Sequence, residues 1–185
     1  MRVAVVIIIL CLLTGCAFNT EYLDKPMQLR NQLLGSEQCT FEAAVTAHYP
    51  DAEYQFQLTC IVDSSGILTF TVTAPDSISG ICGQISNDGA ALTFDEQVLA
   101  FPILADGRLS PASGPWVFYH TLRSGYLSGS QENDKGYLLS IDDSFNEDPL
   151  HLQIQLNENC IPVYAEIYYQ QKMVLSLDII SFTAV

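Results

Sequence analysis

Three consecutive segments of the chain alternate apolar and polar residues, and this pattern constrains the fold more than any other feature. Apolar residues take the odd positions from Phe41 to Ala47, and the even positions from Tyr54 to Val62 and from Leu68 to Ala74. A period of two is typical of strands that have one buried face and one face in water. Turn-forming residues separate the segments at 49–51 and 63–66. The sequence therefore predicts an antiparallel sheet.

Changes of period predict helices between the strands. Ile78, Ile81, Cys82 and Ile85 follow a helical spacing after Pro75, and a second helix is expected over 110–124, ending at Gly125. A short amphipathic helix is expected over 28–34, where Gly35 ends it. Further strands are expected at 91–94, 98–104, 126–130, 137–141, 150–156, 163–170 and 173–182. The predicted fold class is α+β: a strongly curled antiparallel sheet of about ten strands, an unclosed half-barrel, with two or three helices covering its concave face.

The first sixteen residues have the character of an export signal. Arg2 precedes an apolar run of eleven residues, from Val3 to Leu13, which is too short to span a bilayer. The run ends in Leu13-Thr14-Gly15-Cys16, which resembles the bacterial lipobox. That resemblance implies cleavage after residue 15 and acylation of Cys16, so that the protein is anchored to a membrane and lies outside the cytoplasm. An ordinary signal peptide with a cysteine at this place by chance is the alternative.

The expected organisation is a signal peptide at 1–15, a lipidated tether at 16–27 that Pro26 interrupts, and one domain at 28–185. We expect the anchor to hold the protein on the outer face of the cell membrane, or on the outer membrane if there are two. Two or more acyl chains hold a protein stably on a membrane, whereas one chain does so only marginally.

Composition excludes several partners. The 185 residues carry 7 Lys and Arg against 21 Asp and Glu, a net charge of −14. Nucleic acids and anionic membrane surfaces are bound through clustered basic residues, so neither is an expected partner. Apolar residues make up 49% of the chain, which is typical of a folded domain and not of disorder.

Four cysteines remain in the expected domain besides Cys16. They are Cys39, Cys60, Cys82 and Cys160, and none stands in a C-x-x-C pair. Cys39 and Cys60 lie almost symmetrically about the turn at 49–51, so a hairpin would bring them opposite each other, leaving Cys82 and Cys160 as the second pair. Export permits disulfides, and four buried free thiols are the alternative.

The sequence carries none of the motifs of hydrolases, neither G-x-S-x-G nor S-x-x-K nor H-E-x-x-H. His48, His120 and His151 lie far apart along the chain. The acidic run 141–148 does not have the spacing of an EF-hand loop, and a solvated loop is the expected structure. We therefore expect a protein that is not an enzyme, with no cofactor and no metal.

Three segments resemble the LolA/LolB-type lipoprotein-carrier superfamily. They are Val72-Thr73-Ala74-Pro75-Asp76-Ser77-Ile78-Ser79-Gly80-Ile81, then Arg108-Leu109-Ser110-Pro111 ahead of the second helix, and Ile161-Pro162-Val163-Tyr164-Ala165-Glu166-Ile167. The chain is especially similar to LolA-like lipoproteins of clostridial-type bacteria, over about residues 28–183. The resemblance implies an open β-barrel with a helical lid over a hydrophobic cavity.

Two functions follow from this reading. The first is binding of an acyl chain, a lipid or another hydrophobic ligand in the trough of the sheet. The candidate lining residues are Phe41, Phe56, Phe70, Ile78, Ile81, Phe94, Trp116, Phe118, Tyr119 and Leu122, with Arg123 at the mouth. The second is a module that docks or regulates a cell-envelope protein, for example a peptidoglycan-processing one, with the trough filled by the chain's own side chains. An anchored chain would receive or hold a ligand, since it cannot shuttle.

Overall fold

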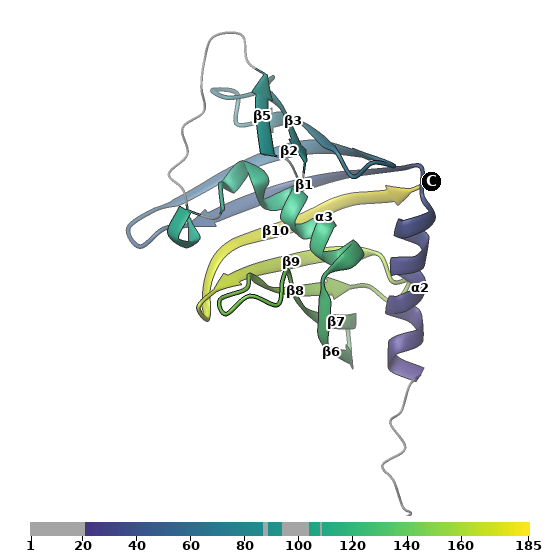
Figure 1. Cartoon of the computed structure of the whole chain (residues 1–185). Coiled ribbons are helices and arrows are strands. Elements are labelled where there is room, and N and C mark those ends of the chain that lie inside the picture. Colours follow the sequence, from purple (N-terminus) through teal and green to yellow (C-terminus); the bar gives the residue numbers. More distant parts are fainter. Residues whose placement is uncertain (1–20, 87–88, 94–103, 108) are drawn as a thin grey trace, which may run out of the picture.

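A ten-stranded antiparallel sheet and two long helices form the computed structural model, which describes residues 21–86, 89–93, 104–107 and 109–185 (Figure 1). The strands lie in the order β5-β4-β3-β2-β1-β10-β9-β8-β7-β6. Strands and helices are segregated, so the predicted α+β class and the number of strands are confirmed.

Two meanders of five strands each make up the sheet. The first contains β1 (Gln38–His48), β2 (Glu53–Asp63), β3 (Leu68–Ala74), β4 (Cys82–Ser86) and β5 (Gly89–Thr93). The second contains β6 (Tyr126–Asn133), β7 (Gly136–Asp142), β8 (His151–Leu156), β9 (Pro162–Tyr169) and β10 (Lys172–Ala184). The pairing of β1 with β10 joins the meanders in the middle of the sheet. Phe94 and most of the strand expected at 98–104 lie outside the described residues.

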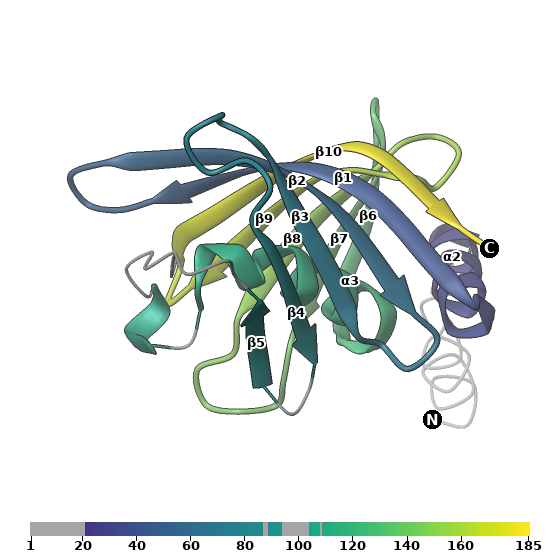
Figure 2. The ribbon, with the colours of Figure 1, turned by 90° about the horizontal axis from the view of Figure 1, so that it is seen from above.

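The sheet curves around one helix, and the other helix stands at one end of it (Figures 1 and 2). Helix α3 (Gly114–Ser124) follows a 3-10 turn, η2 (Pro111–Ser113), and packs across β1, β10, β9, β8 and β7. Helix α2 (Glu21–Gly35) packs against α3 and β6. A second short turn, η1 (Ala105–Gly107), precedes η2. The concave face is thus covered by α3 along its length and by α2 at one end.

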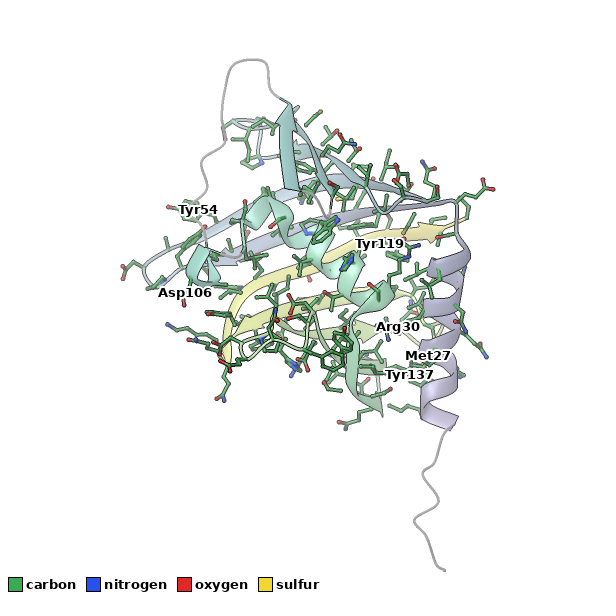
Figure 3. The ribbon with its side chains drawn as sticks, in the orientation of Figure 1. Met27, Arg30, Tyr54, Asp106, Tyr119 and Tyr137 are labelled. Carbon is green, nitrogen blue, oxygen red and sulfur yellow. The ribbon has the colours of Figure 1, made fainter. Side chains whose placement is uncertain are left out.

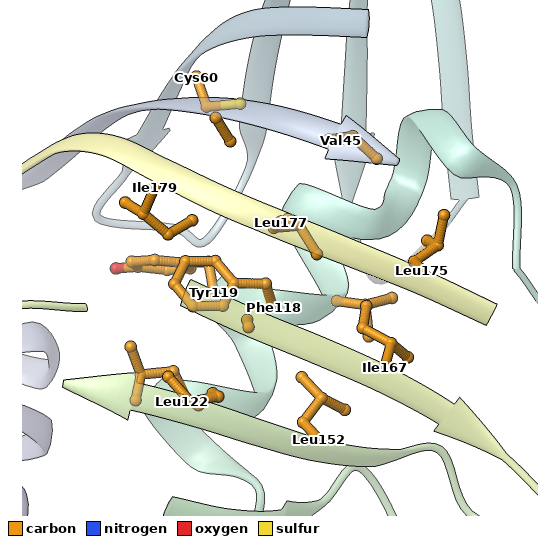
Figure 4. Close-up of a cluster of buried hydrophobic side chains, with 14 of the residues drawn as sticks. Val45, Cys60, Phe118, Tyr119, Leu122, Leu152, Ile167, Leu175, Leu177 and Ile179 are labelled. Atoms are coloured by element: carbon orange, nitrogen blue, oxygen red, sulfur yellow. The ribbon is translucent and has the colours of Figure 1, made fainter. Parts of the chain in front are cut away.

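Alternation along the strands produces the core. In β1 every second residue from Cys39 to Ala47 is buried, and β8 buries Leu152, Ile154 and Leu156 in the same way. These side chains meet the buried side of α3 (Figure 4). The Phe41 ring packs edge-on against the Phe118 ring, with ring centroids 5.7 Å apart, and stacks on the Phe182 ring at 5.9 Å. Burial of this one face stabilises the whole sheet, because each buried aliphatic or aromatic side chain contributes about 1.5–3 kcal/mol.

The helix predicted after Pro75 is wrong. Residues 75–80 form turns, with hydrogen bonds from the Ile78 and Gly80 N–H groups to the Pro75 and Val72 carbonyls, and β4 follows at Cys82. Gly80 has a φ of +88°, a conformation that glycine adopts without strain and that a helix cannot contain. The backbone hydrogen bonds that β4 makes with β3 stabilise a strand here, although the spacing of the isoleucines fits a helix. In this strand burial alternates, and Gly83 and Ile85 are the buried residues.

The first helix starts earlier than the sequence predicts. It runs from Glu21 and holds Pro26 inside it, so Pro26 does not interrupt the chain before the helix. A proline near the start of a helix removes only one backbone hydrogen bond, and the buried Pro26, Leu29 and Leu33 anchor this helix by packing. No helix within the described ranges is long and apolar enough to cross a membrane.

Of the two alternatives for the cysteines, the structure has free thiols at Cys39, Cys60, Cys82 and Cys160, of which Cys39 and Cys60 are buried. Cys39 lies opposite Val62, and Cys60 lies opposite Phe41, so the two are diagonal neighbours and not a directly facing pair. Cys82 on β4 is separated from β9, which follows Cys160, by β3, β2, β1 and β10. Burial raises the pKa of the Cys39 thiol to about 12 and raises that of Cys60 as well, so both remain protonated.

Close packing of α3 on β10 predicts the effect of one added methyl group. A Cβ at Gly114 would lie 2.8 Å from Leu175 Cδ1, a contact that forces Leu175 or the helix to move. We expect Gly114→Ala to lower the free energy of unfolding by about 1–3 kcal/mol, measured by urea denaturation. Gly35→Ala is the matched control, because nothing lies within 4 Å of that Cβ position, and it should not destabilise the protein. Equal stability of both variants with the wild type would contradict the packing described here.

Candidate functional site

The candidate site is the interface between α3 and the concave face of the sheet. The structure buries six of the candidate residues in one core, namely Phe41, Phe56, Phe70, Phe118, Tyr119 and Leu122. Ile78 and Ile81 are partly buried against this core, from the turn before β4 and not from a helix. Trp116 and Arg123 are half-buried on α3, and Phe94 is not among the described residues.

Side chains fill the space under α3. Phe41, Phe118 and Leu122 have no exposed surface, and the Phe41 and Phe118 rings pack edge-on against each other. Three hollows lined by described residues have volumes of about 470, 460 and 240 Å³. They lie beside α2, along β6 and on the outer face of β1 and β2. In this structure the trough is therefore closed over by its own residues.

Arg30 of α2 holds the end of α3. Its Nε donates a hydrogen bond to the Leu122 carbonyl at 2.8 Å, and Nη2 donates to the carbonyls of Thr121 at 3.3 Å and of Gly125 (Figure 3). Arg30 is only 9% exposed. The last carbonyls of a helix have no partner within the helix, so this one side chain supplies the donors that the end of α3 lacks.

The positive charge of Arg30 lies at the C-terminal end of α3, where the helix dipole favours a cation. The C-terminal end of a helix carries a partial negative charge, which a cation stabilises. Both ion pairs among the described residues involve histidine, and neither includes Arg30. Burial lowers the pKa of Arg30, but a guanidinium stays protonated in proteins. Within the described residues, its charge is therefore offset by the carbonyl dipoles that it contacts.

Sequence reasoning missed Arg30, although a signal for it was present. Arg30 lies between Leu29 and Leu33 on the side of α2 that is buried. A basic residue on the apolar side of a short helix is a candidate for a contact with a buried acceptor. What the sequence does not reveal is that the acceptors belong to a helix 91–95 residues away.

The other side of α3 carries Trp116 and His120, whose rings stack with centroids 4.7 Å apart. In the structure Val117 and Thr121 are buried as well, because the curved sheet surrounds the helix more widely than a flat one would. Burial lowers the pKa of His120, Arg123 lowers it further, and Asp143 raises it.

Three buried polar atoms on this helix, Trp116 Nε1, Thr121 Oγ1 and Arg123 Nε, have no hydrogen-bond partner among the described residues. Their donor capacity is therefore unused. A ligand with an oxygen atom near any of them would gain a hydrogen bond without displacing an existing one.

The groove of about 470 Å³ beside α2 lies outside the predicted site. It lies between Lys25, Gln28 and Gln32 of α2, the turn 158–161 and the end of β10. Lys25 also lies over the Tyr137 ring, 5.4 Å from its centroid. The groove has a mixed polar and apolar lining, which suits an amphipathic group better than a bare hydrocarbon chain.

The acidic run 141–148 begins with the last two residues of β7 and continues through the loop between β7 and β8. Asp143 accepts a hydrogen bond from the Leu150 N–H at 2.9 Å, and Asp142 lies 2.8 Å from Nδ1 of His151. Within the described part of the chain, no group of three or more His, Cys, Asp or Glu residues is placed to hold a metal ion. Phe145, at the tip of this loop, is 81% exposed.

No protein-family model matches the sequence, and neither does any curated protein. Several solved structures are similar in fold at low identity. A LolA superfamily protein from Nitrosomonas europaea is 11% identical, with 86% of this chain and 93% of that chain covered and a TM-score of 0.44. A putative outer membrane lipoprotein-sorting protein domain from Vibrio parahaemolyticus is 4% identical, with 86% and 91% covered and a TM-score of 0.41.

A chain of the MucA/MucB complex of Pseudomonas aeruginosa is 11% identical, with 87% of this chain and 57% of that chain covered and a TM-score of 0.37. All three TM-scores are below 0.5, so the function is argued from the geometry of this chain itself.

The Arg30 contact predicts a large effect of its removal. Arg30→Met keeps much of the side chain's volume but removes the Arg30 donors from the carbonyls of Leu122 and Gly125, and a buried carbonyl left without a donor costs about 1–3 kcal/mol. We expect the free energy of unfolding to fall by about 2–4 kcal/mol, measured by urea denaturation with Trp116 fluorescence. Arg123→Met, which changes the other arginine of this region, is the matched control and should cost less. A loss below about 0.5 kcal/mol for Arg30→Met would show that the contact does not hold the helix.

Proposed function

We propose that this protein is a membrane-anchored, extracytoplasmic lipoprotein that does not catalyse a reaction and binds an acyl chain or another hydrophobic ligand between α3 and the sheet. The observation that carries the proposal is the chemistry of this interface. Aliphatic and aromatic side chains make it, and the Arg30 hydrogen bonds that tie α3 to the rest of the protein are at one end of the helix.

An acyl chain can replace the side-chain contacts of this interface at little cost in free energy. Burial of a CH₂ group contributes about 0.8 kcal/mol whether the group belongs to a side chain or to a ligand. An acyl chain that entered as α3 moved outward would therefore replace contacts of Phe118 and Leu122 with equivalent ones. The Arg30 contact would remain as a pivot at the C-terminal end of α3, while the apolar N-terminal part moved.

The same closed trough favours a second candidate function. If the packed side chains under α3 are a permanent core, the protein acts as a module that binds a cell-envelope protein on its surface. The observation in its favour is that Phe41, Phe118 and Leu122 of this core have no exposed surface.

Trp116 is the only tryptophan of the chain and lies on α3, so its fluorescence reports movement of this helix. We expect oleate, titrated into residues 17–185 purified without detergent, to change Trp116 emission saturably, with a dissociation constant in the micromolar range or below. Trp116→Phe is the control that must lose the signal, while native mass spectrometry still counts bound oleate.

Three outcomes separate the candidates. Bound oleate together with a change in Trp116 emission supports ligand binding under α3. Bound oleate without that change would place the ligand elsewhere, for example in the groove beside α2. A chain that binds no oleate and carries no copurified lipid would contradict the first candidate and leave the second.

The anchor has its own test, in the full chain expressed in a bacterial host. Fed with an alkyne-labelled fatty acid, the host should label the wild-type protein, and Cys16→Ala should abolish the label because the acylated thiol is gone. Cys11→Ala, in the same leader, is the matched control and should be labelled like the wild type. Equal labelling of Cys16→Ala and the wild type would overturn the assignment of Cys16.

A further inference from the structure

Arg123, near the C-terminal end of α3, is a half-buried arginine whose charge has no partner among the described residues. Both ion pairs in the described ranges involve histidine, and neither includes Arg123. Its Nε atom is buried and makes no hydrogen bond. Nη1 lies 3.5 Å from the position that a Cβ atom would take at Gly66, so the guanidinium lies against the turn between β2 and β3.

This arrangement differs from that of an arginine that only extends into water. Such a side chain lays its aliphatic part on apolar residues and keeps its charged group hydrated. Arg123 instead has a guanidinium nitrogen out of contact with water. Removing a cation from water is costly unless an anion or hydrogen-bond acceptors lie beside it. Arg123 therefore has unused capacity to bind an anion.

Two carboxylates close to this region are used by their own loops. Asp63, in the same turn as Gly66, accepts hydrogen bonds from the Ser65 and Ile67 N–H groups at 2.9 and 3.1 Å. Asp143 accepts one from the Leu150 N–H at 2.9 Å. The structure thus places acidic residues near Arg123 without pairing either of them with its guanidinium.

Further N–H groups lie on the same side of α3. Trp116, His120 and Arg123 are spaced four and three residues apart, which places them on one side of a helix. The Trp116 and His120 rings stack, and Trp116 Nε1 is buried without a partner. Burial and the charge of Arg123 lower the pKa of His120, against the opposing effect of Asp143, so its ring is neutral at neutral pH and carries one N–H donor.

Arg123 also adjoins the apolar core under α3. Tyr119, one helical turn before it, is buried in that core. Burial raises the pKa of Tyr119, and the charge of Arg123 acts in the opposite direction, which shows that the two side chains are close. A ligand with its chain among the core side chains could therefore reach Arg123 with its polar end.

We propose that Arg123, with His120 and Trp116 beside it, binds the anionic headgroup of an amphiphile whose acyl chain lies under α3. The headgroup is a carboxylate or a phosphate, because the planar guanidinium donates two parallel hydrogen bonds to either. The inference rests on the proposed ligand binding under α3 and adds the charge of the ligand. The chain has a net charge of −14, so its overall field repels anions and selectivity for one requires a local site.

Three ligands of matched chemistry test the proposal by isothermal titration calorimetry with residues 17–185. Decyl phosphate carries the anionic headgroup, decanol has the same alkyl chain without the charge, and inorganic phosphate has the charge without the chain. We expect the wild type to bind decyl phosphate about tenfold more tightly than decanol, because hydrogen bonds to charged groups are stronger than those to neutral ones.

Variants of two basic residues locate the headgroup. Arg123→Met should bind decyl phosphate no more tightly than decanol, and Arg123→Lys, which keeps the charge but lacks the planar fork, should keep part of the preference. Lys25→Met is the matched control, because Lys25 lies in the groove beside α2, and it should keep the preference of the wild type. Urea denaturation checks that each variant is folded under the conditions of the titration.

The outcomes separate this inference from the proposed function. Equal binding of decyl phosphate and decanol by the wild type would overturn the headgroup site and leave binding under α3 standing. A preference lost in Lys25→Met but kept in Arg123→Met would place the headgroup in the groove beside α2 and overturn the site as well. Binding of inorganic phosphate alone would make free phosphate the ligand and contradict both proposals. Binding of none of the three ligands would contradict both as well.

Discussion

A sheet of ten strands with one apolar face is stable only if that face is covered, and this requirement governs the rest of the structure. The buried residues of both meanders lie on the concave side, and α3 is the element that covers them along the middle. Curvature follows from the same requirement, because a single helix covers a curved sheet better than a flat one (Figure 2). The other face carries polar residues, such as Gln153, Glu166 and Ser176 in register across β8, β9 and β10.

The carbonyl groups at the C-terminal end of α3 are buried, and Arg30 donates hydrogen bonds to them. The C-terminal carbonyls of α3 are turned into the protein at the point where the chain enters β6, away from water. Arg30 reaches them from α2, so the helix at the end of the barrel and the helix over the trough form one unit. The position of α2 is thereby coupled to that of α3, although the two helices are far apart in the sequence.

Alternation made most of the sheet predictable from sequence. The strands from β1 to β3 lie where the period of two places them, β6 to β10 lie at the further segments where strands are expected, and Gly125 ends the second helix as expected. The segment after Pro75 was not predictable from its own residues. The isoleucines at 78, 81 and 85 fit a helix, but the neighbouring strand β3 offers backbone pairing that a local pattern does not report.

The sequence predicts which residues make the candidate site, but it does not predict whether they fill the space under α3 or line a cavity there. The buried positions of Phe41, Phe118 and Leu122 follow from periodicity, since apolar residues on the inner faces of strands and helices converge. Whether converging side chains fill a trough or line a cavity depends on the spacing between helix and sheet, which no residue pattern encodes. The Arg30 contact joins distant parts of the chain, so it emerges only from the fold.

The strand order has a consequence for how the chain reaches its folded form. Each meander is built from neighbours in sequence and can begin to form locally, but the central pairing joins residues as distant as Cys39 and Ala184. Closing so long a loop delays that step. On a membrane surface, where the N-terminal end of the domain would be tethered, the two halves would search for each other in a restricted volume. The central seam is thus the pairing that requires the longest loop closure in the sheet, and its absence would leave two unpaired inner edges.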